Sequence, residues 1–404
     1  FLFLIQIHAI MKFTAALLCI QAASAKVYFK ETFADKERWT TSVMNDKKDS
    51  DMGEWALTPG KWHADFSDLA LQTTEDARFY GISAPLDSPF TNKDKDLVIQ
   101  YTVKHEQKME CGGAYIKLLG GGKEFPASTF GGDTPYAVMF GPDICGSPRR
   151  THTIFNYPPK DDNLLVSKDI KCETDQLSHL YTLHVKADNT FEVLIDNKSV
   201  RAGSLEDEFP FLEPRQIKDP AVSKPSDWVD ERKIPDPSDV KPDGYDDIPP
   251  SIPDPSASKP DDWDDEDDGE WEAPVISNPE YKGEWKPAMI DNPEYKGEWV
   301  HPMVDNPAYS PDPELHYRCD GCTHVGFELW QVSSGTSFDD IIITDDIKEA
   351  QAFAEETFFK RVEGEKKMFE DEQEKEREER ERERKEREAK EKAEKDEEEE
   401  HDEL

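Results

Sequence analysis

Short runs of alternating apolar and polar residues recur along the chain from position 27 to about position 211. Each run has the length and the β-branched or aromatic content of a strand, and Gly, Pro or Asp breaks the pattern between runs. A hairpin turn is expected at Asp188-Asn189. The spacing predicts an antiparallel β-sandwich. The predicted strands are Asp96–His105, Ala114–Leu119, Tyr136–Phe140, His152–Tyr157, Leu180–Lys186 and Phe191–Asp196.

The strand pattern stops near position 215 and resumes in Gly326–Val332 and Ile341–Thr344. Two isolated strands cannot form a domain, so we expect them to complete the first sandwich and residues 215–313 to be an insertion. After Asp346 a helix is predicted, with an apolar face that fades beyond Gly364. The following mixture of Glu with Lys and Arg predicts either an exposed helix or disorder. The apolar residues at helical spacing are Ile347, Ala350, Ala354, Phe358 and Val362.

The insertion consists of two short units that each occur three times. The first reads IKDPAVSKPSDW from position 217 and recurs at 234 and 252, and the second reads NPEYKGEW from 278 and recurs at 292 and 306. A Pro every few residues excludes regular helix and central strand. We therefore expect a long hairpin, in which one repeat set runs out and the other returns, with its turn at Asp264–Trp271.

Aromatic residues at a fixed register favour this hairpin over a disordered Pro/Asp-rich linker, because a linker does not need them. With few aliphatic residues, the arm must be ordered by aromatic rings that pack against prolines and the opposite strand. These rings are Trp228, Tyr245, Trp263, Trp285 and Trp299.

Both ends of the chain indicate the secretory pathway. An apolar run after Met11 and the small residues before Lys26 predict a signal peptide cleaved after Ala25, with residues 1–10 as translated upstream sequence. The final residues His401–Leu404 read HDEL, a retrieval signal of the endoplasmic reticulum lumen. No later apolar stretch is long enough for a membrane span. We expect a luminal protein that is retrieved by the HDEL receptor.

Charge and motifs narrow the function further. The net charge of −40 excludes binding to a nucleic-acid backbone and favours cations. No predicted strand carries the alternating Glu-x-Asp-x-x-Glu pattern of a jelly-roll glycosidase, and there is no nucleophile elbow or phosphate loop. An EF-hand register at positions 264–275 fails because Pro274 and Val275 occupy its end. We therefore expect a binding protein and not an enzyme.

The two repeat types, KPxDW and NPxYKGEW, resemble the proline-rich arm of the calreticulin/calnexin family, and the HDEL end matches its soluble calreticulin branch. The resemblance implies a concanavalin-like jelly roll and a calcium-binding lectin chaperone for monoglucosylated N-glycans. It divides the chain into a signal peptide (1–25), a lectin domain in two parts (26–214 and 314–363), the arm (215–313) and a charged tail (364–404). The chain is expected to be a monomer.

Candidate sugar-binding residues lie on two predicted strands. Tyr115 and Lys117 are two residues apart and so share one face of a strand. Each residue taken alone could be an ordinary half-buried strand residue. The family has Asp where this chain has Glu328, one methylene longer, which could shift the geometry toward a sugar. The resemblance assigns sugar binding to Tyr115, Lys117, Tyr136, Asp143, Glu328 and the platform Trp330, with packing by Met139.

Five cysteines follow the predicted cleavage site, so at least one thiol must stay free. The resemblance implies a disulfide between Cys111 and Cys145 and a free Cys172. For Cys319 and Cys322 we expect either a local disulfide or two inert thiols, in preference to a redox motif.

Calcium, the cofactor that the resemblance implies, is expected at two levels. A high-affinity site would use Asp339 with backbone oxygens of Thr32, Ser67 and Leu69, and the acidic tail would bind many ions weakly. The resemblance also implies that the arm tip recruits a disulfide-isomerase-type oxidoreductase through Glu266, Asp268, Glu270 and Trp271. It marks His152 as functionally important, and Asn197 begins a glycosylation sequon.

The favoured hypothesis is a luminal lectin chaperone that promotes the folding of glycoprotein clients and contributes to calcium storage. Two alternatives remain from the sequence: a calcium-storage protein with a vestigial lectin site, and a secreted immune-modulating binding protein. Glycan binding would separate the first hypothesis from the second.

Overall fold

A computed structural model describes residues 25–120, 125–260, 263 and 269–402 of the chain, with backbone alone from 392 onward. It divides into two compact units, one formed by the residues before and after the arm and the other by Pro214–Tyr309. The predicted signal peptide lies outside the described residues except for Ala25, and so does most of the predicted arm turn.

The described residues of the first unit form two eight-stranded antiparallel sheets. In the first sheet, β1 pairs with β22 in addition to the main strand order. That order is β14 (Lys198–Ser204), β13 (Thr190–Ile195), β12 (Ser178–Val185), β6 (Leu97–His105), β22 (Thr336–Thr344), β4 (Ala70–Thr73) and β3 (Trp55–Thr58), with β1 at Val27–Glu31.

The second sheet carries most of the expected sugar-binding residues. In it, β8 pairs with both β9 and β21 beside the main order. That order is β11 (Asp162–Leu165), β10 (Arg149–Tyr157), β9 (Tyr136–Cys145), β7 (Cys111–Gly113), β21 (Cys322–Gln331), β5 (Arg78–Phe90) and β2 (Thr40–Thr41), with β8 at Ile116–Gly120.

Aromatic rings from both sheets meet in one core, which confirms the predicted sandwich. The ring of Phe327 on β21 lies 4.2 Å from that of Phe338 on β22, and Tyr101 on β6 contacts Phe140 on β9. All four rings are fully or almost fully buried. Since β21 and β22 follow the arm in sequence, the core needs chain from both sides of the insertion, as predicted.

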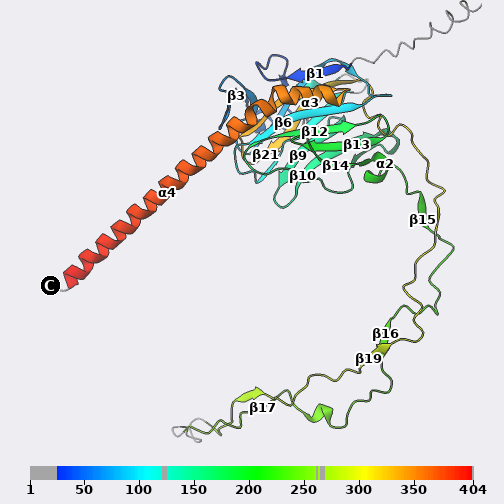
Figure 1. Cartoon of the computed structure of the whole chain (residues 1–404), viewed down its shortest axis with the longest axis vertical. Helices are drawn as coiled ribbons and strands as arrows, with labels where there is room; N and C mark the ends of the chain where they lie inside the picture. Colours follow the sequence, from blue (N-terminus) through cyan, green and yellow to red (C-terminus); the bar gives the residue numbers. More distant parts are fainter. Residues whose placement is uncertain (1–24, 121–124, 261–262, 264–268, 403–404) are drawn as a thin grey trace, which may run out of the picture. The chain divides into compact units, whose positions relative to one another are not determined.

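Two helices follow the last strand, and α3 lies across β6 and β12 of the first sheet (Figure 1). Helix α3 spans Ile347–Glu356. The backbone of the next residue, Thr357, leaves helical geometry, and α4 (Phe358–Asp402) begins directly after it. Ala350, Ala354 and Phe358 are buried against the sheet, as the spacing predicts. No helix in the described part of the chain is both long enough and apolar enough to cross a membrane.

The second unit is a hairpin held by three short antiparallel strand pairs, which confirms the predicted arm. Each pair joins a repeat of the first kind to one of the second kind. The pairs are β15 (Gln216–Lys218) with β20 (Met303–Asp305), β16 (Lys233–Pro235) with β19 (Met289–Asp291), and β17 (Ser251–Pro253) with β18 (Val275–Ser277).

Short helices complete the described elements. They are α2 (Leu205–Glu208) and the 3-10 turns η1 (Asp49–Asp51), η2 (Ala127–Thr129), η3 (Pro158–Lys160) and η4 (Tyr245–Asp247).

Candidate functional site

Strand register places the expected sugar-binding side chains on one face of the second sheet. Lys117 on β8 lies opposite Met139 on β9 and opposite Gly326 on β21. Because side chains alternate along a strand, Glu328 and Trp330 share the face of Gly326. These residues thus come from three adjacent strands, β9, β8 and β21. The whole arm separates β21 in sequence from the other two.

Lys117 is the centre of this face. Its ammonium lies 2.7 Å from Glu328 Oε2, 4.9 Å from the ring centroid of Tyr136 and 6.0 Å from that of Tyr115. The Lys117 residue is only 3% exposed, so its charge needs the carboxylate and the ring faces as partners. The longer side chain of Glu328 reaches this ammonium directly.

Asp143 and His152 form a second polar pair next to Tyr115. Asp143 Oδ2 lies 3.0 Å from His152 Nε2, and the rings of His152 and Tyr115 are 6.0 Å apart. His152 Nδ1 is buried and has no hydrogen-bond partner among the described residues. His152 therefore positions the Asp143 carboxylate beside Tyr115, and its functional importance stays a prediction.

Two glycines make room for the site. A Cβ at Gly113 would lie 2.5 Å from the Tyr115 ring, and a Cβ at Gly141 would lie 1.7 Å from the hydroxyl of Tyr101. Gly141 also has a φ of +126°, which side chains rarely adopt. The glycine at the end of β7 therefore leaves the space that the Tyr115 ring occupies.

Trp330 stays accessible at the edge of this face. It is 37% exposed, and its ring centroid lies 4.5 Å from that of Phe79 on the neighbouring strand β5. The ammonium of Lys47 also lies over the Phe79 ring, 4.4 Å from its centroid. An exposed indole supported by a second ring can serve as a platform for the apolar face of a sugar. Sequence reasoning missed Phe79, because no strand was predicted at Arg78–Phe90.

The site holds neutral tyrosines beside fixed charges. Burial raises the pKa of Tyr115 far above the ordinary value, and the carboxylates of Glu328 and Asp143 raise it further. Burial and then Glu328 also raise the pKa of Tyr136. Both hydroxyls therefore remain protonated and can donate hydrogen bonds, while Asp143 and Glu328 offer acceptors. This mixture of donors, acceptors and ring faces suits a polyhydroxylated ligand.

A model of the family described as "Calreticulin family" matches residues 28–269 and 267–343. The chain belongs to the calreticulin family. Calreticulin from Chlamydomonas reinhardtii is 55% identical over 355 residues, covering 87% of this chain and 84% of that protein. Calreticulin from Dictyostelium discoideum is 52% identical over 352 residues, covering 86% and 81%. The solved T. cruzi calreticulin globular domain aligns with a TM-score of 0.59 at 33% identity, covering 86% of this chain and 97% of that one.

Membership makes this chain a calreticulin-type lectin chaperone, from a family of chaperones and not of enzymes. Calreticulins bind calcium, have glycoprotein clients and are typically luminal proteins of the endoplasmic reticulum. The jelly-roll sandwich with an inserted arm and a C-terminal helix is the architecture expected of the family.

Two disulfides are present in the described chain. Cys111 and Cys145 are paired at the end of β7 and β9, where they lie directly opposite each other. Cys319 and Cys322 are also paired, which decides between the two alternatives left by the sequence. Cys172 is free, and burial raises its pKa to about 11, so it is a poor nucleophile at neutral pH.

The Asp339 side chain, as it is arranged, does not fit the role of a calcium ligand. Asp339 is 4% exposed, its Oδ2 lies 2.9 Å from Arg361 Nη2, and its Oδ1 accepts the backbone N–H of Asp340 at 2.8 Å. Both oxygens are therefore already engaged. Ser67 makes two hydrogen bonds to Asp65 in the loop beside this cluster. In the described residues, no group of three or more His, Cys, Asp or Glu side chains could hold a metal ion.

The arm tip is described only in part. Glu266 and Asp268 lie outside the described residues, Glu270 is exposed and Trp271 is half-buried. Part of the Trp271 side chain therefore remains accessible. Oxidoreductase binding at this tip stays a prediction.

Proposed function

We propose that this chain binds monoglucosylated N-glycans of newly made glycoproteins in the lumen of the endoplasmic reticulum and promotes their folding. The observation that supports this most strongly lies on one face of the second sheet. There Tyr115, Tyr136 and Glu328 surround the ammonium of Lys117.

The arrangement offers each kind of contact that a glucose residue needs. Lys117 and the tyrosine hydroxyls donate hydrogen bonds, the carboxylates of Glu328 and Asp143 accept them, and Trp330 presents a partly exposed ring. A polar site of this kind discriminates strongly, because a ligand without the right hydroxyls leaves buried groups unpaired. A terminal glucose, which adds hydroxyls in a fixed arrangement, is the part of the glycan that we propose is read here.

We also propose three partners for the rest of the chain. Glu270 and Trp271, with Glu266 and Asp268, would recruit a disulfide-isomerase-type oxidoreductase to the client. The HDEL end would bind the retrieval receptor, and the acidic surface of the arm and tail would bind calcium weakly and so contribute to storage.

A matched pair of variants tests the glycan site. Asp143→Asn removes the carboxylate that faces His152 on β10, and Asp169→Asn removes an exposed carboxylate 3.4 Å from Arg150 on the same strand. Both variants lose one negative charge. Isothermal titration calorimetry with a glucosylated trimannose arm should show affinity lowered about tenfold or more for Asp143→Asn and unchanged for Asp169→Asn. Equal affinities in the two variants would remove Asp143 from the site.

A further inference from the structure

The guanidinium of Arg361 on helix α4 lies among three carboxylates. Its Nη1 is 2.7 Å from Asp68 Oδ2, and its Nη2 is 2.9 Å from Asp339 Oδ2 and 2.5 Å from Asp340 Oδ2. The side chains of Asp339 and Asp340 are 5% and 1% exposed, and that of Arg361 is 16% exposed. One cation therefore serves three acids in a largely dry environment.

An irregularity in β22 turns two acids toward the helix. Asp340 has a φ of +51°, and the pairing of β22 with β6 shifts register between Asp339 and Ile342. A bulge of this kind re-aims side chains. As a result, consecutive residues Asp339 and Asp340 both reach Arg361, where ordinary alternation would send one of them to the other face.

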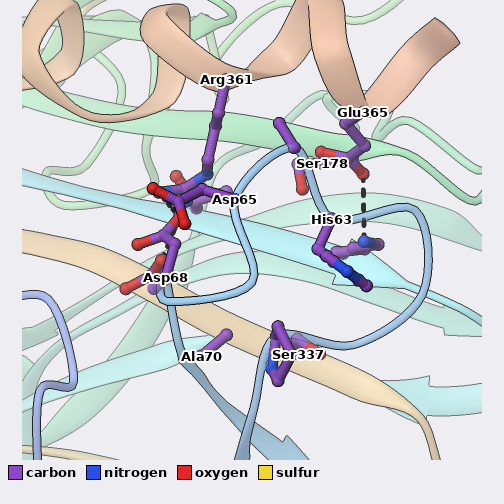
Figure 2. Close-up of a pocket in the computed structure, with 13 residues that line it drawn as sticks. His63, Asp65, Asp68, Ala70, Ser178, Ser337, Arg361 and Glu365 are labelled. Atoms are coloured by element: carbon purple, nitrogen blue, oxygen red, sulfur yellow. Dashed lines mark hydrogen bonds and ion pairs between the residues drawn. The ribbon is translucent and has the colours of Figure 1, made fainter. Parts of the chain in front are cut away.

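Arg361 is held in place by the way α4 docks. On the following turns, Glu365 accepts the backbone N–H of Ser178 at 3.0 Å and lies 3.3 Å from the ammonium of Lys104. Figure 2 shows Arg361 and Glu365 pointing from one helix toward the same pocket, with Arg361 directed at the loop that carries Asp65 and Asp68. The cavity has a volume of about 40 Å³.

Two more contacts extend this docking face along the helix. The ring of Phe369 packs edge-on against Trp62 at 4.8 Å, and the Trp62 indole donates to Glu372 Oε2 at 2.8 Å. Positions 361, 365, 369 and 372 lie on one side of a helix. Withdrawal of the guanidinium would remove the ion pairs that link α4 to Asp68, Asp339 and Asp340 and so weaken the docking of its first turns.

We propose that Arg361 is the resident cation of this site and competes with calcium for Asp339. Calcium needs six to eight oxygen ligands, and the oxygens of Asp339 are occupied while the guanidinium is bound. A divalent ion placed beside the guanidinium would also meet a like charge in a dry site. Calcium binding at Asp339 and docking of α4 therefore weaken each other by the same factor. This inference concerns the cation and the helix and does not depend on glycan binding.

Removal of the guanidinium tests the proposal in the full chain. Arg361→Gln should raise the affinity for calcium about tenfold or more at one site, as measured by calorimetry with calcium chloride. Without calcium the variant should melt several degrees below the parent, because three carboxylates lose their cation, and calcium should restore the Tm. The matched control is Arg377→Gln, which removes one cation from an exposed pair with Glu374 on the same helix.

A second variant keeps the proposal testable if Arg361→Gln does not fold. Asp339→Asn should leave the calcium affinity of the parent chain unchanged, because the parent does not bind calcium there with α4 docked. Loss of a calcium site in Asp339→Asn would overturn the proposal. Equal calcium affinities in Arg361→Gln and Arg377→Gln would overturn it as well.

Discussion

Gly113 determines where the Tyr115 ring can lie. An added Cβ would meet that ring at 2.5 Å, so the tyrosine would have to move away from the sheet. We expect Gly113→Ala to weaken glycan binding about tenfold, since one displaced hydroxyl loses about one hydrogen bond in a desolvated site. Calorimetry with the glucosylated trimannose arm measures the change.

Gly132 provides the control for this substitution. A Cβ there would have Glu328 Oε1 as its nearest atom, at 3.8 Å, which is an ordinary contact. Gly132→Ala should therefore bind the glycan as the parent does. If both alanine variants bind the glycan like the parent, the Tyr115 ring does not contact the sugar from the position that it has in the structure.

His179 makes the stability of the folded chain depend on pH in the alkaline range. Its ring lies 2.9 Å from Asp196 and 3.0 Å from Asp175; burial disfavours the charge, but these two hydrogen bonds outweigh it and raise the pKa of His179 to about 10. Because this pKa is above the unfolded value of 6.5, the contribution is complete below pH 6.5 and is lost as the pH rises to 10.

We expect His179→Gln to lower the free energy of unfolding by about 2 kcal/mol at pH 6 and by much less near pH 10. Urea titrations at the two pH values measure the difference, with His301→Gln in the arm as a control that should change neither. A loss of equal size at both pH values would show that the charge of His179 is not responsible.

The individual residues that could be predicted from sequence are those whose role depends on local spacing. For Tyr115 and Lys117, the period of a strand predicted a shared face, while their sugar-binding role came from the family resemblance and stays a prediction. Arg361 could not be predicted, because its partners come from a distant loop and from a bulge whose position no local pattern marks. The docked face of α4 beyond Gly364 was also missed, because it is built from Glu365 and Glu372 as well as Phe369.

Strand β5 shows why some elements were not found. It contains Pro85 and Pro89, which lack an N–H and count against a central strand. The short strand β2 pairs only with Ile82 and Ser83, so both prolines lie where β5 has no partner on that side. Only the full sheet order reveals that this part of β5 is an edge.

The arm repeats form equivalent contacts along the hairpin. The indole of Trp228 donates to the carbonyl of Gly297 at 2.9 Å, and the indole of Trp263 donates to that of Gly269 at 2.9 Å. Both glycines have positive φ, at +90° and +82°, so in these two repeats a Trp donor meets a Gly in a left-handed conformation. The fixed register of these repeats thus has a hydrogen-bond basis.

Replacement of one indole tests this contact. Trp228→Phe keeps an aromatic ring but removes the donor, which should destabilise this part of the hairpin by about 1 kcal/mol. Faster hydrogen exchange is expected at the amide of Lys296, which donates to the carbonyl of Val229 at 2.9 Å. Tyr245→Phe, at the equivalent repeat position, should leave that exchange rate unchanged. Unaltered exchange in Trp228→Phe would contradict the role given to the indole.

The chain as a whole is organised by a discontinuous domain. β1 pairs with β22, and β5 pairs with β21, so strands on both sides of the arm are joined in each sheet. This pairing was predicted, because the two strands that follow the arm cannot form a domain by themselves. The strand order within the sheets was not predictable, because long-range packing decides the positions of β21 and β22.

The face around Lys117 is proposed to recognise a terminal glucose. The most direct test is calorimetry of the unaltered full chain with two oligosaccharides, the glucosylated trimannose arm and the same arm without glucose. Saturable binding of the first at one site per chain, with affinity for the second lower by about a hundredfold or more, is the predicted result. Equal binding of both oligosaccharides, or binding of neither, would contradict the claim.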